Sequence, residues 1–403
     1  MVTKCIRLGD CIQCNPKVKL TRGELYPLID IDKITIGRKY VSNKTFITFA
    51  GQGGCKFESG DTLMARITPC LENGKMAVAK IASKGLGSTE LFVFRSKHGV
   101  TDEEFVYYLL KQQYIRNLAA NSMTGASGRQ RADLKFIKRI KIQLPNLDVQ
   151  HRIASILSTY DTLIENNTKR IRLLEKMAEN LYKEWFVRFR FPGYEDVEME
   201  NGLPKGWKIS IIKDFGRIET GKTPSTKNTE FYGGKFLFIK TPDMHDVFFV
   251  NSTEETLSDL GSKSQEKKLL PPNSIMVSCI GTGGVVAINS RQGHTNQQIN
   301  STILSDLSDL EWLFMVCKGL KPTIELFGAT GATMTNLSKR KFEKLKVIEP
   351  PKSVRYLFHD KVQSAFKLMQ ELAKQNSLLA RQRDLLLPRL MSGKLEVKTE
   401  THN

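Results

Sequence analysis

The segment Gly216–Thr223, GRIETGKT, has the residue types and spacing of a phosphate-binding loop, G-x-x-x-x-G-K-[ST]. In such a loop, backbone N–H groups and the lysine bind the phosphates of a nucleotide, and the hydroxyl group ligates magnesium. A helix must begin directly after the loop, because the helix N-terminus faces the phosphates. The chain instead continues with residues 224–228, PSTKN, a turn-forming run without helical periodicity. A nucleotide hydrolase therefore stays an alternative that needs support from the rest of the chain.

Other motifs of catalysis are missing from the sequence. The proline-containing segments Asn15–Lys17 and Pro271–Asn273 do not fit the [DNS]-P-P-[YFW] tetrad of DNA methyltransferases. No G-x-S-x-G or H-E-x-x-H pattern occurs either. Cys11 and Cys14 form a lone C-x-x-C pair without a second pair at zinc-site spacing, which favours buried thiols. The sequence therefore predicts neither a catalytic residue nor a metal ligand.

Composition and charge indicate the class of partner. At 403 residues and 40% hydrophobic, the chain is long enough for several domains with cores of their own. It has 61 Lys plus Arg against 42 Asp plus Glu, a net charge of +19. Such an excess favours a polyanionic partner, nucleic acid before membrane, over a surface that is merely basic. No apolar run approaches the ~18 residues of a membrane span, and the scattered cysteines fit reduced thiols, so we expect a cytoplasmic protein.

A long internal repeat decides how the loop motif is interpreted. Five pairs of segments match in the same order, with offsets between 205 and 212 residues. The pairs are Leu8-Gly9 with Phe215-Gly216, Gly60–Met64 with Pro272–Met276, Asp102–Phe105 with Asp309–Trp312, Thr124–Ala126 with Thr330–Ala332, and Lys138–Pro145 with Glu343–Pro350. In the first copy Cys14-Asn15-Pro16 takes the place of the Lys-Thr-Pro segment. A structural turn shared by both copies explains the motif better than a nucleotide site that one half would lack.

Each copy begins with a part that we expect to be α+β, residues 1–145 and 191–349. Short β-like runs alternate there with Gly-rich turns. The expected strands are Phe46–Phe49, Leu63–Ile67, Ala77–Ile81 and Leu91–Phe94, then Phe236–Ile239, Ile275–Ile280, Val285–Ile288 and Ser301–Leu304. One helix is expected late in each part, Asp102–Leu118 and Asp309–Leu320, with acidic residues in its first turn.

Each copy ends in a long helix, expected over residues 146–190 and 350–396, with a tail at 397–403. Apolar residues recur there with a heptad period, which is typical of a coiled coil. The predicted seam contains Ile153, Tyr160, Leu163, Asn167, Leu174, Leu181, Phe358, Leu372, Leu379 and Leu386. We expect the two helices to form an antiparallel coiled coil with pseudo-two-fold symmetry. Asn167 and Asn376 lie on or beside the seam, where each either fixes the register or occupies a solvated flank.

Two similar basic domains on a helical spacer suggest that the protein binds two short DNA sequences separated by an unread gap. Duplication within one chain imitates a symmetric dimer, whose half-sites lie about one helical turn, ~34–36 Å, or a multiple of it apart. The two copies differ strongly in their polar residues, so the half-sites should differ as well. We therefore expect a bipartite, asymmetric target in double-stranded DNA.

The chain resembles the specificity (S) subunits of type I restriction-modification enzymes over nearly its whole length. The resemblance is carried by the duplicated layout and by four segments in order: Trp185–Phe189, Leu203–Trp207, TGKTPSTKN with Tyr232-Gly233-Gly234, and Leu387–Gly393. It implies a non-catalytic chain with two target recognition domains, one in each α+β part. One departure is the start of the second helix, where Arg355–Phe358 stands in place of Gln150–Ile153. Partner docking need not be symmetric in detail for that reason.

The resemblance also implies the partners and their cofactors. The helices would set the gap and dock modification (methyltransferase) subunits, two in number, which recruit the restriction (translocase and endonuclease) subunits. S-adenosylmethionine, ATP and magnesium would bind to those partners and none of them to this chain. A self-sufficient DNA-binding or architectural protein is the other alternative, and it would need no methyltransferase.

Candidate DNA contacts are polar residues in turns, because Arg, Lys, Asn and Gln read base edges while hydroxyl and N–H groups bind phosphates. In the first domain they are Arg66, Lys75, Ser122, Thr124, Arg129 and Arg131. In the second they are Lys222, Thr223, Ser225, Thr226, Lys227, Lys240, Arg291, Gln292, His294, Asn296, Gln297, Gln298, Thr330, Thr333, Thr335 and Asn336. The run Arg291–Gln298, RQGHTNQQ, is the preferred base reader, although Asn296 or Gln297 could instead tie the loop to its own backbone.

The segment Trp185–Phe191, WFVRFRF, alternates aromatic and basic residues. Aromatic side chains of this kind either stack on single-stranded bases or pack the helix onto the second domain. We favour packing, because the aromatics continue the seam into a Pro-Gly stop.

Overall fold

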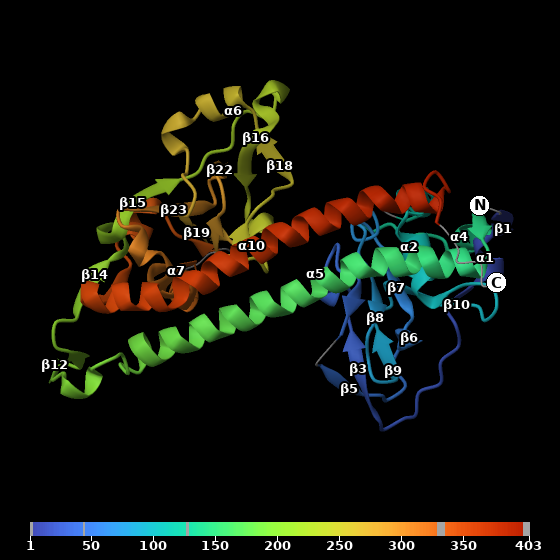
Figure 1. The fold of residues 1–403 in the computed structure, drawn as a ribbon, viewed down its shortest axis with the longest axis horizontal. Coiled ribbons are helices and arrows are strands. Elements are labelled where there is room, and N and C mark those ends of the chain that lie inside the picture. Colours follow the sequence, from blue (N-terminus) through green and yellow to red (C-terminus); the bar gives the residue numbers. More distant parts are fainter. Residues whose placement is uncertain (1–2, 43–44, 126–128, 329–334, 398–403) are drawn as a thin grey trace. The chain divides into compact units, whose positions relative to one another are not determined.

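The computed structural model describes residues 3–42, 45–125, 129–328 and 335–397. The chain divides into two compact units, Met1–Asn166 with Leu378–Asn403, and Asn167–Ser377. Each unit contains one α+β domain and one segment of each long helix (Figure 1). The predicted α+β class is confirmed. No helix among the described residues is long and apolar enough to span a membrane.

The first unit is built on a five-stranded sheet in the order β2-β10-β7-β8-β4. Neighbouring strands are antiparallel except for β4 and β8, which are parallel. Its strands are β2 (Ile12–Cys14), β10 (Leu91–Ser96), β7 (Thr62–Ala65), β8 (Met76–Ala79) and β4 (Tyr40–Val41). A second sheet contains β5 (Phe46–Thr48), β3 (Leu25–Ile29), β9 (Lys84–Gly87) and β6 (Cys55–Glu58), and β1 (Thr3–Arg7) pairs with β11 (Lys141–Pro145). The helices are α1 (Leu8–Cys11), η1 (Ile31–Lys33), α2 (Glu103–Lys111), α3 (Gln113–Asn121) and α4 (Leu134–Arg139).

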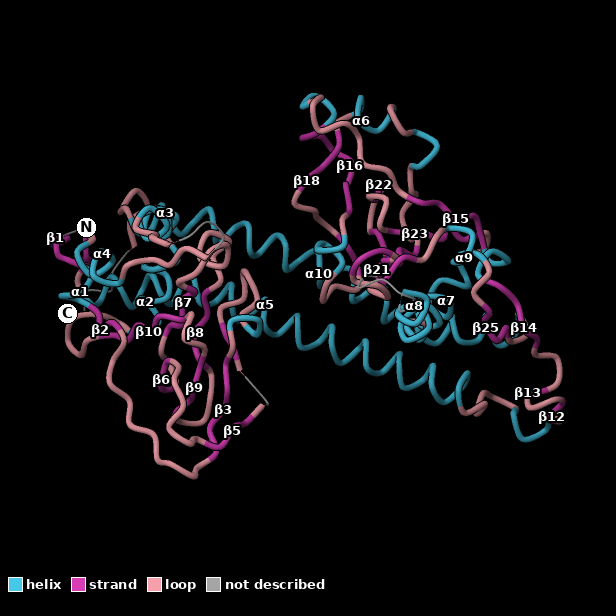
Figure 2. Tube along the Cα trace, turned by 180° about the vertical axis from the view of Figure 1, so that it is seen from behind, coloured by secondary structure: helices cyan, strands magenta, loops and turns pink. Residues whose placement is uncertain are grey.

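The second unit repeats this topology, with a five-stranded sheet in the order β15-β23-β19-β21-β17. Its strands are β15 (Gly216–Thr220), β23 (Ile299–Leu304), β19 (Ile275–Ser278), β21 (Val286–Asn289) and β17 (Phe249–Val250). A smaller sheet contains β18 (Glu255–Leu257), β16 (Tyr232–Ile239) and β22 (Gly293–Thr295), which Figure 2 shows beside α6 (Asp259–Lys263). The strand pairs are β12 (Met199–Glu200) with β13 (Leu203–Pro204), β14 (Lys208–Ile211) with β25 (Lys346–Glu349), and β20 (Ile280–Gly281) with β24 (Thr335–Asn336).

The remaining helices of the second unit are short. They are η3 (Tyr194–Asp196), η4 (Ile212–Phe215), η5 (Thr229–Phe231), η6 (Thr241–Met244), η7 (Glu266–Lys268), η8 (Leu307–Asp309), α7 (Leu310–Gly319), α8 (Lys321–Gly328) and α9 (Lys339–Glu343). The edge strand β17 is parallel to β21, and β22 is parallel to β16, as β4 is to β8 and β9 is to β3 in the first unit. The sequence repeat is therefore a duplication of one fold.

The secondary structure largely follows the apolar patterns. All eight expected strands are present, with boundaries shifted by a few residues. The helix expected at Asp102–Leu118 is an exception, because the backbone of Gln112 is extended (φ −56°, ψ 132°) and separates α2 from α3. Neither proline nor glycine marks this break in the sequence. As a result, α3 has an N-terminus of its own inside the first unit.

The long helices are α5 (Leu147–Tyr182), which ends in the π-helical turn η2 (Lys183–Val187), and α10 (Lys352–Met391). They pack together in antiparallel direction. In the second unit Asn167 Nδ2 donates to Gln375 Oε1 at 3.4 Å, and the Tyr182 and Phe358 ring centroids lie 6.4 Å apart. Asn167 is 8% exposed, so this asparagine lies in the seam.

Nine of the ten predicted seam residues are buried or half-buried. Leu163 is the exception, since it is 45% exposed. The inward position near it is taken by Asp161, which forms an ion pair with Arg383 of α10. In the second unit Trp185 and Phe186 are buried against Phe358, with ring centroids 5.8 Å and 5.0 Å from it. Packing, and not base stacking, therefore accounts for these two aromatic residues of the WFVRFRF segment.

Candidate DNA interface

In the second unit, several loops meet at the turn Asn296–Gln298, which joins β22 to β23. Lys222 N donates to Thr295 O at 2.9 Å, and Thr223 Oγ1 donates to Gln297 Oε1 at 2.8 Å. Thr241 Oγ1 donates to Gln298 Oε1 at 3.3 Å. The first two bonds fix the Lys-Thr segment of the loop motif against the turn, and the third fixes the loop after β16 there.

The loop motif has a structural explanation in this arrangement. A Cβ atom on Gly221 would lie 2.2 Å from the carbonyl oxygens of Thr295 and Asn296, so only glycine fits there. The residues before Gly221 form strand β15, and no helix begins at Thr223. The geometry that a phosphate-binding loop requires is missing, and the nucleotide-hydrolase alternative loses its only motif.

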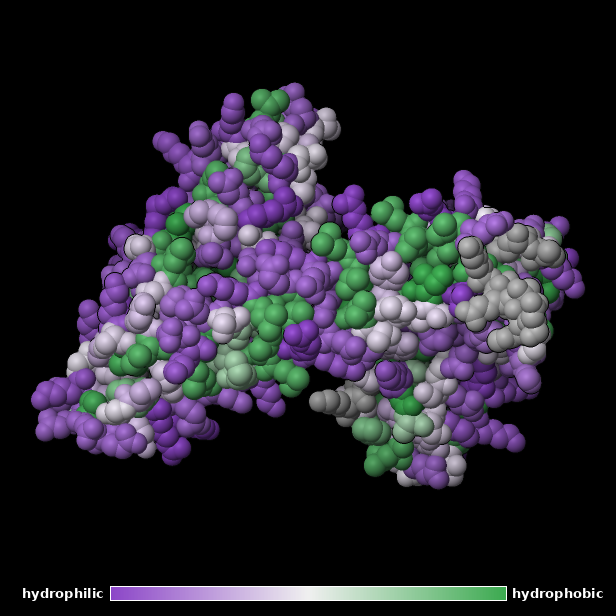
Figure 3. All heavy atoms as spheres, viewed as in Figure 1, coloured by the Kyte–Doolittle hydropathy of each residue, from purple (hydrophilic) through white to green (hydrophobic). Residues whose placement is uncertain are grey.

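Four exposed polar residues lie at or beside this turn. We refer to Lys222, Thr223, Gln297 and Asn336 as the second-unit edge. All four are exposed. Asn336 lies in β24, which pairs with β20, and a Cβ atom on Gly281 of β20 would lie 3.7 Å from Gln298 Nε2. The pairing therefore brings Asn336, which lies 39 positions after Gln297 in the sequence, next to the Gln297-Gln298 turn. Figure 3 shows that the visible surface around α6, β16 and β18 is mainly hydrophilic.

The run Arg291–Gln298 does not form a single reading surface, contrary to the sequence interpretation. His294 is fully buried in β22, and its Nε2 lies 2.9 Å from Ser262 Oγ. Burial lowers the pKa of His294 to about 4. Asn296 is 9% exposed, and its Oδ1 accepts a hydrogen bond from Gln298 N at 3.1 Å, so it ties the loop to its own backbone. We therefore remove His294 and Asn296 from the candidate contacts.

The other candidates of the second unit are less well placed. Arg291 and Gln292 are exposed at the opposite end of β22 from the turn, and Arg291 Nη1 donates to Lys235 O at 2.6 Å. Lys240 is half-buried and paired with Glu255 at 2.6 Å. Ser225, Thr226 and Lys227 are exposed in the turn before η5. Thr330 and Thr333 lie outside the described residues, and Thr335 is described only by its backbone in β24.

In the first unit, the segment Arg131–Ala132 packs beside the residues that follow β7. Ala132 N donates to Arg66 O at 2.8 Å, and Ile67 and Arg131 form an antiparallel bridge. In the second unit Leu337 N donates to Cys279 O at 2.8 Å, beside the β20–β24 pair. Both units therefore present the same edge of the fold.

Most first-unit candidates already have intramolecular partners. The Arg131 guanidinium binds both oxygens of Glu90, at 2.6 Å from Nη2 to Oε1 and 2.9 Å from Nε to Oε2, and this bonding lowers the pKa of Glu90. The Arg66 guanidinium lies 5.0 Å from the Phe92 ring centroid. Lys75 Nζ donates to Ile31 O at 3.1 Å, and Ser122 Oγ donates to Ala119 O at 2.7 Å.

Thr124 and Arg129 are the two remaining candidates of the first unit. Both are exposed, and neither side chain has a partner within the described part of the chain. We refer to Thr124 and Arg129 as the first-unit edge. Its chemistry differs from that of the second-unit edge, since a guanidinium stands in one and amide groups in the other.

The described residues thus form two related α+β domains on paired helices, each with an exposed polar edge. The family model of the type I restriction modification DNA specificity domain matches residues 5–176 and again residues 204–383. The chain belongs to this family. It is the non-catalytic specificity subunit of a type I restriction-modification system and determines DNA target recognition.

Known relatives agree in sequence and fold. The HindI specificity subunit of Haemophilus influenzae is 32% identical, over 86% of this chain and 88% of its own length. The MjaIX specificity subunit of Methanocaldococcus jannaschii is 28% identical, over 75% of this chain and 71% of its own. The S subunit of a type I restriction-modification system from M. genitalium has the same fold, with a TM-score of 0.52, 14% identity and 96% of each chain covered.

Proposed function

We propose that the protein reads a bipartite, asymmetric site in double-stranded DNA, with one half-site bound by each domain. The observation that carries the proposal is the duplicated fold with the same exposed edge in both units and different side chains on each edge. Arginine pairs best with guanine and glutamine with adenine in the major groove. Different edges on one framework should therefore select different half-sites.

The remaining parts of the system follow from the family. The chain would direct two modification (methyltransferase) subunits to the site, and these would recruit the restriction subunits. S-adenosylmethionine, ATP and magnesium would act on those partners, in the cytoplasm. The paired helices α5 and α10 would set the unread gap between the half-sites.

Lys222 and Gln297 provide a test of the second-unit edge. In the assembled methyltransferase, Lys222→Ala should weaken binding to all duplexes, because a lysine binds phosphate, whereas Gln297→Ala should relax the preference at one base pair by about 1–3 kcal/mol. Lys213→Ala is a matched control, since Lys213 is exposed in η4, away from the turn. Binding is measured by fluorescence anisotropy with a series of duplexes that carry single base changes. The proposal fails if both edge variants bind and discriminate as the control does.

A further inference from the structure

The duplication supplies an internal comparison for a pair of buried lysines. Lys318 of α7 and Lys111 of α2 occupy the same position of the repeat, 207 residues apart. Lys318 Nζ forms ion pairs with Glu175 at 2.7 Å and with Glu179. Burial lowers the pKa of Lys318, but the bonds from these two carboxylates outweigh burial and raise it. In the second unit this lysine is therefore fully neutralised.

The first unit does not neutralise its lysine in the same way. The repeat positions of Glu175 and Glu179 are Ala380 and Asp384 in α10. Asp384 is engaged with the Arg383 guanidinium at 3.0 Å, and its Oδ1 forms a longer ion pair with Lys111 Nζ at 3.6 Å at the wall of the cavity described below. The Lys111 side chain is only 15% exposed and makes no hydrogen bond to any described residue. Burial, followed by the charge of Arg383, lowers the pKa of Lys111.

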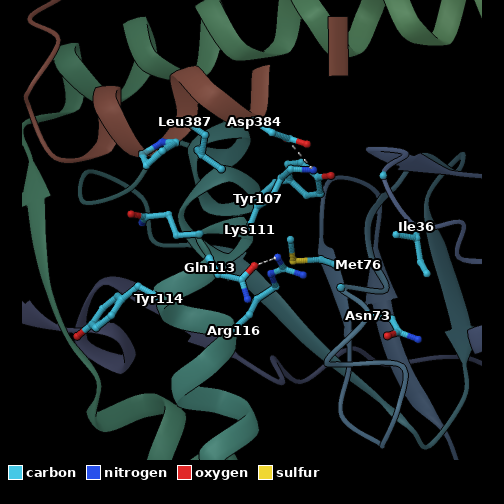
Figure 4. A pocket seen from close by; sticks show the side chains of 14 residues that line it. Ile36, Asn73, Met76, Tyr107, Lys111, Gln113, Tyr114, Arg116, Asp384 and Leu387 are labelled. Atoms are coloured by element: carbon cyan, nitrogen blue, oxygen red, sulfur yellow. Dashed lines mark hydrogen bonds and ion pairs between the residues drawn. The ribbon is translucent and has the colours of Figure 1, made fainter. Parts of the chain in front are cut away.

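Lys111 lines a cavity of about 510 Å³ between α2, α3, the turn before β8 and the end of α10 (Figure 4). Arg116 lines the same cavity; its Nη2 donates to Gln113 Oε1, and its Nε is buried without a partner among the described residues. The first residues of α3 also line it, and α3 has neither a side-chain cap nor an acidic residue in its first turn. Helix N-termini of this kind favour negative charge. Apolar walls come from Ile36, Met76, Leu387 and Pro388.

We propose that this cavity binds a small organic anion, a phosphate or carboxylate with an apolar body, whose charged group pairs with Lys111 and Arg116. The anion supplies the negative charge that Glu175 supplies to Lys318 in the second unit. The volume lies within the range of small-molecule sites, ~300–1,000 Å³, and exceeds what inorganic phosphate alone would fill. The site is separate from both DNA-reading edges and does not depend on their assignment.

The test is isothermal titration of the full chain with phenyl phosphate, inorganic phosphate and uncharged phenol. Phenyl phosphate should bind best and phenol should not bind. Lys111→Met and Arg116→Met should each weaken phenyl phosphate binding by about tenfold or more, since each removes one charge partner. Arg381→Met is the matched control, because Arg381 is exposed on α10 and does not line the cavity.

Ala380→Glu keeps the proposal testable if the charge-removing variants fold poorly. This change copies Glu175 of the second unit, so an internal carboxylate should abolish binding while thermal stability is kept or raised. A competition experiment with duplex DNA distinguishes two possible occupants of the cavity. If DNA displaces phenyl phosphate, the natural occupant is a phosphate group of DNA. If DNA does not displace it, the natural occupant is a free metabolite. The proposal is overturned if the natural chain does not bind phenyl phosphate at millimolar concentration, or if Ala380→Glu binds it unchanged.

Discussion

Removal of Arg383 should destabilise the first unit strongly. Arg383 is 1% exposed in α10, and its guanidinium forms an ion pair with Asp161 of α5, whose side chain is 2% exposed. Asp161 also accepts a hydrogen bond from Tyr108 OH at 2.5 Å. Arg383→Ala would remove the cation paired with the buried Asp161 carboxylate and leave it with the Tyr108 hydroxyl and the more distant charge of Lys39. Breaking a buried ion pair by removing one partner costs about 3–5 kcal/mol.

The cost is measured by thermal unfolding monitored by circular dichroism. For a unit of roughly 190 residues, a loss of 1 kcal/mol in the free energy of unfolding lowers the melting temperature by about 2–4 °C. The melting temperature of the first unit should therefore fall by about 6–20 °C. Arg381→Ala, on the exposed side of the same helix, should change stability by less than about 0.5 kcal/mol.

A double-mutant cycle decides whether the two charges act together. If they do, the double variant Asp161→Ala with Arg383→Ala should lose less unfolding free energy than the two single variants lose together, by about 1–3 kcal/mol. The buried-pair argument would be refuted if the losses in unfolding free energy were purely additive. It would also be refuted if Arg383→Ala and Arg381→Ala had the same melting temperature.

Three further predictions concern the second unit. Arg355→Gln, which copies Gln150 of the first repeat, leaves buried Asp309 without its ion-pair partner and Glu349 with Lys208 alone. It should lower the free energy of unfolding by about 3 kcal/mol in denaturant titrations, and a loss below about 1 kcal/mol would contradict this. The free energy of unfolding should fall by up to about 3 kcal/mol as pH decreases from 6.5 towards about 4. In this range His294 binds a proton in the unfolded state, whereas in the folded state it is buried and stays neutral. His294→Gln should flatten this part of the pH profile, and an unchanged profile would assign the loss to other groups. Lys222→Ala should reduce the slope of log affinity for DNA against log salt by about one, and an unchanged slope would show that this lysine binds no phosphate.

The fold was largely predictable because its main signals are local or repeated. Apolar runs marked the strands, heptads marked the helices, and the matched segments identified one fold present twice. The break at Gln112 was not predictable, since residues 102–118 have continuous helical periodicity and no proline or glycine. The break is visible only in the structure, where the extended backbone of Gln112 separates α2 from α3.

The site was less predictable, because polarity in a sequence does not reveal burial. His294 stands in a polar run, yet the run crosses strand β22 and the imidazole faces the interior. Asp161 and Arg383 lie more than two hundred positions apart, so charges on two different helices gave no sign of pairing. Gly221 was visible within the loop motif, but its role in a close backbone approach required the structure.

The most direct test of the central claim is genome-wide adenine methylation, mapped by long-read sequencing in the native host and in a strain that lacks this gene. One split motif with two different half-sites should lose its methylation in the deletion strain and regain it when the gene is restored. Restoration with Gln297→Ala should relax the motif in one half only. Unchanged methylation in the deletion strain, or loss of a single uninterrupted motif, would contradict a two-domain reader of a bipartite site.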